Sequence, residues 1–197
     1  YAAMSAAAHF AWANRQLIGH WTRKAWHKVI SRSTPLTTVY DVSHNIGKKE
    51  NHSIDGKEVE LLIHRKGATR AFGPHSKDIP SCYQETGQPV LIPGTMGTSS
   101  YILVGTAQNK DLTFGSCCHG AGRKMSRMQA KRTLPGHILK SQLKEKGIII
   151  RCDSERGLVE EAPGAYKDVD NVIDVVASAG IARKVARTIP RAVIKGN

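Results

Sequence analysis

The chain has 197 residues, 40% of them hydrophobic and 6% aromatic, which suits a globular domain and excludes a low-complexity or disordered chain. Its 29 lysines and arginines outnumber 16 acidic residues and give a formal net charge of +13, so we expect a polyanionic partner, most often nucleic acid. No apolar run approaches the roughly 18 residues of a membrane span, and no signal peptide opens the chain, so no membrane partner is expected.

The four cysteines indicate a reducing setting. Cys82, Cys117, Cys118 and Cys152 form no C-x-x-C pair, and the adjacent pair would bridge only with strain. We therefore expect a cytoplasmic location, or a nuclear one as well in a eukaryote. The chain starts on Tyr1, inside an alanine-rich helical pattern without a cap, so we expect the beginning of the protein to be missing.

The N-terminal third predicts a long helix, then strands. Residues 1–30 repeat apolar side chains at helical spacing, interrupted by Asn14, which is read as a hydrogen-bonded core residue or one facing a site. Residues 37–42 are β-branched enough for a strand that ends at His44 and Asn45. His44 could bind a metal, with Asp41 or a backbone carbonyl orienting its second ring nitrogen; a plain turn histidine is the alternative.

A hairpin and a basic loop are predicted next. Asp55-Gly56 supplies the positive φ of a tight turn, and residues 59–64 form the returning strand. Residues 65–70 are basic and favour either a solvated turn or contact with nucleic-acid phosphates. Strands at 90–92 and 101–104 flank a loop of small residues, 93–100, whose amides and hydroxyls suit phosphate or sugar oxygens, a β-turn being the alternative. This loop lacks the lysine of a P-loop.

The stretch 115–127 places His119 among small residues, ahead of a basic, helix-like run. Arg123 and Arg127, four residues apart, are expected on one helical face, where they would bind phosphate beside His119; a tight turn before an exposed basic helix is the alternative. Helices are predicted at 125–133, 137–146 and 169–179, the last closed by Gly180, and strands at 148–151 and 189–194. The first two helices carry five basic residues that favour either a polyanion-facing surface or a solvated helix face: Lys131, Arg132, Lys140, Lys144 and Lys146. The fold class is α+β, with antiparallel pairs beside clustered helices.

Four motifs together resemble the RtcB family of RNA ligases: YDVSHN at 40–45, PGTMGTSSY at 93–101, CHGAGR at 118–123 and AVIKG at 192–196. The likeness runs in order along residues 1–195 and covers the C-terminal part of the family's catalytic domain. It implies a GTP- and manganese-dependent ligase that joins RNA ending in a 2′,3′-cyclic phosphate or 3′-phosphate to RNA starting with a 5′-hydroxyl. Such a ligase acts in tRNA splicing and RNA repair on tRNA halves or broken RNA, and an archease-type activator is a further partner that the resemblance allows.

The resemblance also implies roles for single residues. His119 would be the nucleophile that carries GMP as a phosphoramidate, and His44 would be a manganese ligand. The guanylate-binding positions would be His44, Asn45, Pro93, Gly94, Thr95, Met96, Ser100, His119, Gly120, Ala121, Gly122 and Lys195, with Tyr166 as an addition to that pocket. Arg123 and Arg127 are assigned to RNA or GTP phosphates on their chemistry alone.

The chain departs from the family pattern in its metal ligands. The resemblance implies further ligands, an aspartate, a cysteine and more histidines, in an N-terminal half that these residues do not include. We therefore expect that this polypeptide alone neither joins RNA nor binds manganese tightly, and that its first helix leaves an apolar face exposed. Two alternatives stand beside the ligase: a non-catalytic basic RNA-binding module derived from it, and, less favoured, a zinc site on Cys117, Cys118 and His119.

Overall fold

A computed structural model describes residues 1–152 and 155–195, which divide into two compact units, Tyr1–Lys66 and Gly67–Asn197. Each unit is described by itself. Both mix helices with mainly antiparallel strands, so the predicted α+β class is confirmed.

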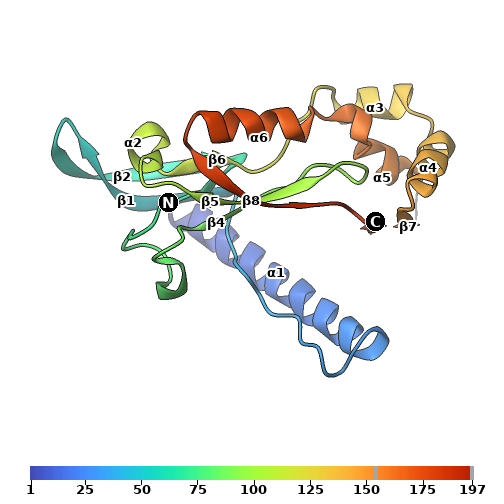
Figure 1. Ribbon diagram of the computed structural model, residues 1–197, viewed down its shortest axis with the longest axis horizontal. Helices are drawn as coiled ribbons and strands as arrows, with labels where there is room; N and C mark the ends of the chain where they lie inside the picture. Colours follow the sequence, from blue (N-terminus) through green and yellow to red (C-terminus); the bar gives the residue numbers. More distant parts are fainter. Residues whose placement is uncertain (153–154, 196–197) are drawn as a thin grey trace. The chain divides into compact units, whose positions relative to one another are not determined.

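The first unit joins a long helix to a β-hairpin (Figure 1). Helix α1 (Ala2–Val29) confirms the helix predicted at 1–30, and strands β1 (Asn45–Ile54) and β2 (Lys57–Lys66) pair antiparallel. Asp55 and Gly56 have φ angles of 49° and 77°, as the predicted turn requires. Met4 of α1 packs on β1 at Gly47, where a Cβ would lie 2.6 Å from the Met4 methyl carbon. The packing fixes the helix against the hairpin.

Most apolar side chains of α1 are exposed, as the sequence indicates. Phe10 is 78% exposed and Trp21 55%, and among the described residues Ala8 alone is buried in this helix. Asn14 is also exposed, so its interpretation as a hydrogen-bonded core residue is wrong. An apolar helix face of this size is normally covered by other protein surface.

The strand predicted at 37–42 is not formed. This segment instead receives side-chain hydrogen bonds from α1: Arg23 donates to the Leu36 carbonyl (3.1 Å) and the Thr38 hydroxyl (2.6 Å). Arg15 binds Asp41 through both an ion pair and a hydrogen bond. The β-branched residues of this segment therefore have no partner strand among the described residues.

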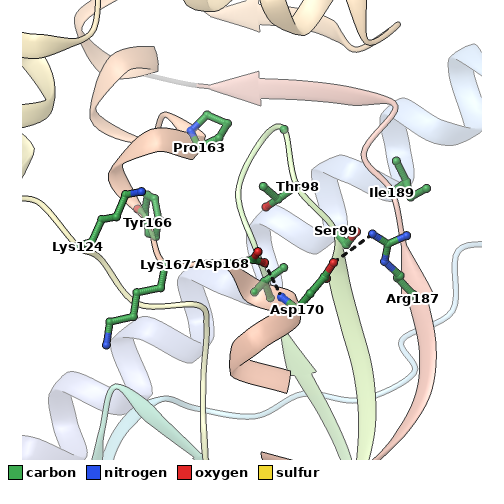
Figure 2. Close-up of a pocket in the computed structure, with 12 residues that line it drawn as sticks. Thr98, Ser99, Lys124, Pro163, Tyr166, Lys167, Asp168, Asp170, Arg187 and Ile189 are labelled. Atoms are coloured by element: carbon green, nitrogen blue, oxygen red, sulfur yellow. Dashed lines mark hydrogen bonds and ion pairs between the residues drawn. The ribbon is translucent and has the colours of Figure 1, made fainter. Parts of the chain in front are cut away.

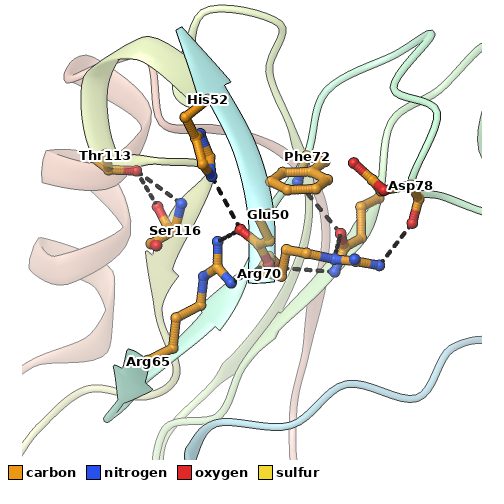
Figure 3. Close-up of polar contacts among 9 residues, drawn as sticks. Glu50, His52, Arg65, Arg70, Phe72, Asp78, Thr113 and Ser116 are labelled. Carbon is orange, nitrogen blue, oxygen red and sulfur yellow. Dashed lines mark hydrogen bonds and ion pairs between the residues drawn. The ribbon is translucent and has the colours of Figure 1, made fainter. Parts of the chain in front are cut away.

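The basic loop predicted at 65–70 is also wrong, because Arg65 ends up in strand β2 and is buried. Its guanidinium forms two hydrogen bonds to the Glu50 carboxylate, at 2.7 and 2.8 Å, and His52 lies 3.1 Å from the same carboxylate (Figure 3). Arg70 ends strand β3 (Ala68–Arg70) and donates to the Asp78 carbonyl at 2.8 Å. Both guanidinium groups serve the fold, since each is committed to an internal acceptor.

The second unit is built on a three-stranded antiparallel sheet in the order β4 (Pro89–Ile92), β5 (Ser100–Gly105), β8 (Ala182–Thr188). Helix α6 (Val169–Ser178) lies against this sheet (Figure 1). Its residues Val169, Ile173 and Val176, which share one helical face, are buried in the same apolar cluster as side chains of the sheet. Asp168 caps its first turn, and Gly180, with φ 71°, follows its end as predicted. This core fixes both ends of the β4–β5 loop.

A second apolar cluster lies under the remaining helices. Leu139 and Leu143 of α4 (Gly136–Glu145) pack with Leu158 of α5 (Glu155–Glu160), and α3 (Arg127–Thr133) lies nearby (Figure 1). Strand β7 (Ile149–Cys152) pairs with β9 (Ala192–Lys195), and this pair is parallel rather than antiparallel.

A short ribbon completes the second unit. Strand β6 (Ser116–Cys118) pairs antiparallel with β3, and helix α2 (Asn109–Thr113) precedes it. The buried Asn109 side chain donates to the Ala71 and Ser116 carbonyls at 2.9 and 3.2 Å, so it joins β6 to the residue that follows β3. Short 3₁₀ turns lie at Ser81–Tyr83 and Pro163–Ala165.

Candidate functional site

His119 begins a turn directly after strand β6, in the second unit. Its backbone amide donates to the Gly67 carbonyl at 3.4 Å. Gly67 has a φ of 69°, and a Cβ there would lie 3.9 Å from Nε2 of His119, so the imidazole ring lies beside a residue without a side chain. The ring is half-buried. It is thus held at one side and retains access to solvent.

The Pro93–Ser100 segment, predicted as a loop of free amides, meets this turn. Ala121 donates its amide to the Pro93 carbonyl at 3.2 Å, and a Cβ at Gly120 would lie 3.5 Å from the same oxygen. The loop is braced internally. Gly94 donates its amide to the Ser100 hydroxyl at 3.2 Å, and Thr95 donates to the Thr98 hydroxyl at 2.7 Å. Two stretches separated in sequence are therefore in direct contact at the predicted nucleophile.

Tyr166 lies on a segment that holds the other end of the turn. Lys167 donates its amide to the Gly122 carbonyl at 2.9 Å, and Lys124 donates to the Ala165 carbonyl at 3.0 Å. Arg123 and Tyr166 face each other in this short antiparallel bridge, with the guanidinium carbon 4.7 Å from the ring centre. The structure therefore brings Tyr166 next to the glycine-rich turn. Burial, and next its hydrogen bond to Glu161, raise the pKa of the Tyr166 hydroxyl.

The predicted helical face with Arg123 and Arg127 is not formed. Helix α3 begins only at Arg127, capped by Ser126, whose hydroxyl accepts from the Gln129 amide at 3.1 Å. Arg123 donates to the Met125 and Glu160 carbonyls and to the Tyr166 hydroxyl, at 3.1, 2.7 and 2.8 Å. Its guanidinium is committed to the fold, whereas the Arg127 side chain is 70% exposed and 3.8 Å from Glu160.

The remaining predicted site residues lie on other elements. His44 and Asn45 are exposed in the first unit, at the start of β1, where His64 lies 3.4 Å from the Asn45 side-chain oxygen. Asp41, proposed to orient His44, is bound to Arg15. Met96 is buried in the second apolar cluster, against which Val193 of β9 packs. Lys195 ends β9, paired in register with Cys152.

A cavity of about 510 Å³ opens beside the same two segments (Figure 2). Its polar lining comprises Thr98, Ser99, Lys124, Tyr166, Lys167, Asp168, Asp170 and Arg187, with Gly97, Pro163, Val169 and Ile189 completing the wall. Asp170 accepts a hydrogen bond from the Tyr101 hydroxyl at 2.8 Å and forms an ion pair with Arg187 at 3.4 Å. Sequence reasoning missed Lys124 and Lys167 here, although each adjoins a residue that it named.

The four cysteines are free. A side-chain hydrogen bond between Cys117 and Cys118 and the burial of Cys117 raise the pKa of Cys117, and the same hydrogen bond lowers the pKa of Cys118 to about 7. Over residues 1–152 and 155–195, no group of three or more His, Cys, Asp and Glu side chains could hold a metal ion, which leaves the zinc alternative without support. In the same residues no helix is both long and apolar enough to cross a membrane, the 28-residue α1 included.

Comparison with known proteins gives one consistent result. The family model described as tRNA-splicing ligase RtcB matches residues 1–196. Proteins named tRNA-splicing ligase RtcB from Archaeoglobus fulgidus and Thermococcus kodakarensis are 54% and 53% identical over the whole of this chain, and a protein of that name from Pyrococcus abyssi is 54% identical.

The match covers part of each relative. The chain spans 41% of the length of the Archaeoglobus and Thermococcus proteins and 22% of the Pyrococcus protein. The place of the matched segment within the relatives' length stays a prediction.

Proposed function

The chain belongs to the RtcB family, and from this premise we propose that it forms part of a GTP- and manganese-dependent RNA ligase. The ligase would join RNA ending in a 2′,3′-cyclic phosphate or 3′-phosphate to RNA starting with a 5′-hydroxyl, in tRNA splicing or RNA repair. The observation that carries the proposal is the His119 turn, held between the Pro93 loop and the Tyr166 segment.

His119 is proposed as the nucleophile. One neutral imidazole nitrogen attacks the α-phosphorus of GTP, a P–N bond forms, and pyrophosphate leaves. Where the RNA ends in a 2′,3′-cyclic phosphate, water first opens the ring, so that the 2′ O–P bond breaks and a 3′-phosphate and a 2′-hydroxyl form. The RNA 3′-phosphate then attacks the same phosphorus, so that GMP passes to the RNA and the imidazole is regenerated. The 5′-hydroxyl finally attacks the activated RNA phosphate, a phosphodiester bond forms, and GMP departs. A half-buried ring suits these steps because it keeps a fixed position while remaining open to a substrate.

Backbone groups near His119 would bind the guanylate. Gly120 and Gly122 present no side chain, so the chain can approach phosphate oxygens closely. The Ser100 hydroxyl, which accepts from Gly94, retains a proton to donate to the nucleotide. From the resemblance we also propose Thr95, Met96, Tyr166 and Lys195 as guanylate-binding residues, and His44 and Asn45 for the same role.

The manganese ions do not fit the described residues alone. No group of three potential ligands is present within them, and His44 is the one manganese ligand that the resemblance implies here. We therefore propose that the other ligands come from the rest of the protein, and that the isolated polypeptide is inactive. An archease-type activator and a cytoplasmic or nuclear location remain part of this proposal.

The test uses the whole protein that contains this chain, incubated with manganese and GTP labelled at the α-phosphate. The expected product is a protein label that is lost in acid and kept in alkali, as for a phosphoramidate. His119→Ala should abolish the label, and His137→Ala, at an exposed histidine of α4, should retain it. A label that survives His119→Ala would refute the nucleophile.

The second candidate, a basic RNA-binding module without catalysis, is favoured by the net charge of +13. It predicts salt-sensitive RNA binding by a protein that takes no label from GTP. The labelling experiment therefore separates the two functions.

A further inference from the structure

The cavity beside the His119 turn carries two lysines that the proposed guanylate pocket does not use. Lys124 and Lys167 both line it, and both are exposed. Within the described part of the chain, neither ammonium group has an ion-pair partner, unlike Lys131 and Lys184, which pair with Glu160 and Asp174. Two ammonium groups on the lining of one cavity attract an anionic ligand to it.

The acidic residues of the cavity offset only part of its positive charge. Asp170 is bound by Arg187 and by the Tyr101 hydroxyl. Asp168 accepts the Asp170 amide and so caps helix α6 (Figure 2). The three cationic side chains of the lining, Lys124, Lys167 and Arg187, outnumber these two carboxylates, so the lining keeps a formal charge of +1 and attracts a negatively charged ligand.

The shape of the cavity suits a nucleotide. A volume of about 510 Å³ lies in the range of pockets that bind small organic ligands. Pro163 and Ile189 supply apolar surface for a base, and the Ser99 side chain adds a hydroxyl for sugar oxygens. Among the residues whose side chains the structure describes, Tyr166 is the one guanylate-binding position implied by the resemblance that lines this cavity, so the cavity adjoins that pocket and adds other residues to it.

We propose that this cavity binds a nucleotide of the RNA strand next to the end being joined, with Lys124 and Lys167 on its backbone phosphates. The proposal rests on the RNA ligase function proposed above. The cavity and the His119 turn share two walls, since the Pro93–Ser100 loop and the Tyr166 segment border both. A strand that enters the cavity is thereby directed toward the nucleophile. Phosphate binding, which the sequence predicts for Arg123, is thus proposed for its neighbour Lys124.

The test measures binding of a short single-stranded RNA to the whole protein as salt is varied. Each phosphate contact contributes a slope of about 0.7 in log K against log salt for a single strand, so Lys124→Gln with Lys167→Gln should lower the slope by about 1.4. At physiological salt the RNA Kd should rise about 10-fold. The GTP label on His119 should be unchanged. Lys124→Arg with Lys167→Arg should keep RNA binding.

A matched control removes the same charge elsewhere. Lys77→Gln with Lys110→Gln, at two lysines outside the cavity, should leave the RNA Kd within twofold. An unchanged slope in the cavity variant, or an equal loss in the control variant, would overturn the proposal, and so would loss of the GTP label with intact RNA binding. Absence of labelling and RNA joining in the unaltered protein would instead refute the ligase function, so the two failures are distinguishable.

Discussion

Arg123→Lys separates a structural role for this arginine from a role in binding phosphate. The guanidinium makes three hydrogen bonds, to Met125, Glu160 and Tyr166, and its side chain is 25% exposed. A lysine ammonium can replace one of them, so two charge-assisted hydrogen bonds are lost, each worth about 1.5 kcal/mol at most after allowance for exposure. The local free energy of opening should fall by about 2–3 kcal/mol.

The assay is amide hydrogen exchange at Lys124 and Lys167, whose amides bridge the two segments that Arg123 joins. A loss of 2–3 kcal/mol corresponds to exchange that is about 30- to 150-fold faster. Arg127→Lys, at a side chain 70% exposed and 3.8 Å from Glu160, should change exchange less than threefold, because an exposed ion pair contributes little. Unchanged exchange in Arg123→Lys, together with weaker RNA binding, would refute the reasoning.

Two further predictions follow from close contacts. A Cβ at Gly94 would lie 2.0 Å from the Ser99 carbonyl oxygen. Gly94→Ala should therefore displace the loop by roughly 1 Å and lower the rate of GTP labelling on the order of 100-fold. The control Gly164→Ala, whose Cβ would lie 3.8 Å from the Leu134 methyl groups, should be labelled at the normal rate. The pKa of Cys118 is lowered to about 7 by its hydrogen bond with Cys117, so its alkylation by iodoacetamide should be half-maximal near that pH and fall about tenfold per pH unit below it. Cys117→Ala should raise that midpoint; mass spectrometry of the alkylated peptides gives both rates.

Elements specified by local sequence could be predicted. Helix α1 follows from its periodicity, the β1–β2 turn from Asp55-Gly56, and the end of α6 from Gly180. Strand β8 could not be predicted from its own sequence. Ala182 is its one buried residue, so the strand lacks an alternation of apolar and polar side chains, and its conformation depends on pairing with β5. The parallel register of β7 with β9 also depends on tertiary packing.

In the candidate site, too, local motifs could be predicted, whereas contacts between distant residues could not. The Pro93 loop and the His119 turn were found as motifs, and the structure brings them into contact. Arg123 was misplaced because the i, i+4 spacing assumed that the helix already begins there, whereas Tyr166, 43 residues away, draws it into a bridge. Arg65 was misjudged for a similar reason, since Glu50 on the neighbouring strand buries its charge.

The backbone hydrogen bonds that hold the His119 turn have a consequence for synthesis of the protein. One of these bonds is accepted by the carbonyl of Pro93, which is translated before His119. Another is donated by the amide of Lys167, which is translated after it. A nascent chain still on the ribosome at Gly122 has half of that support. The His119 turn therefore acquires its full set of backbone hydrogen bonds only after translation passes Lys167.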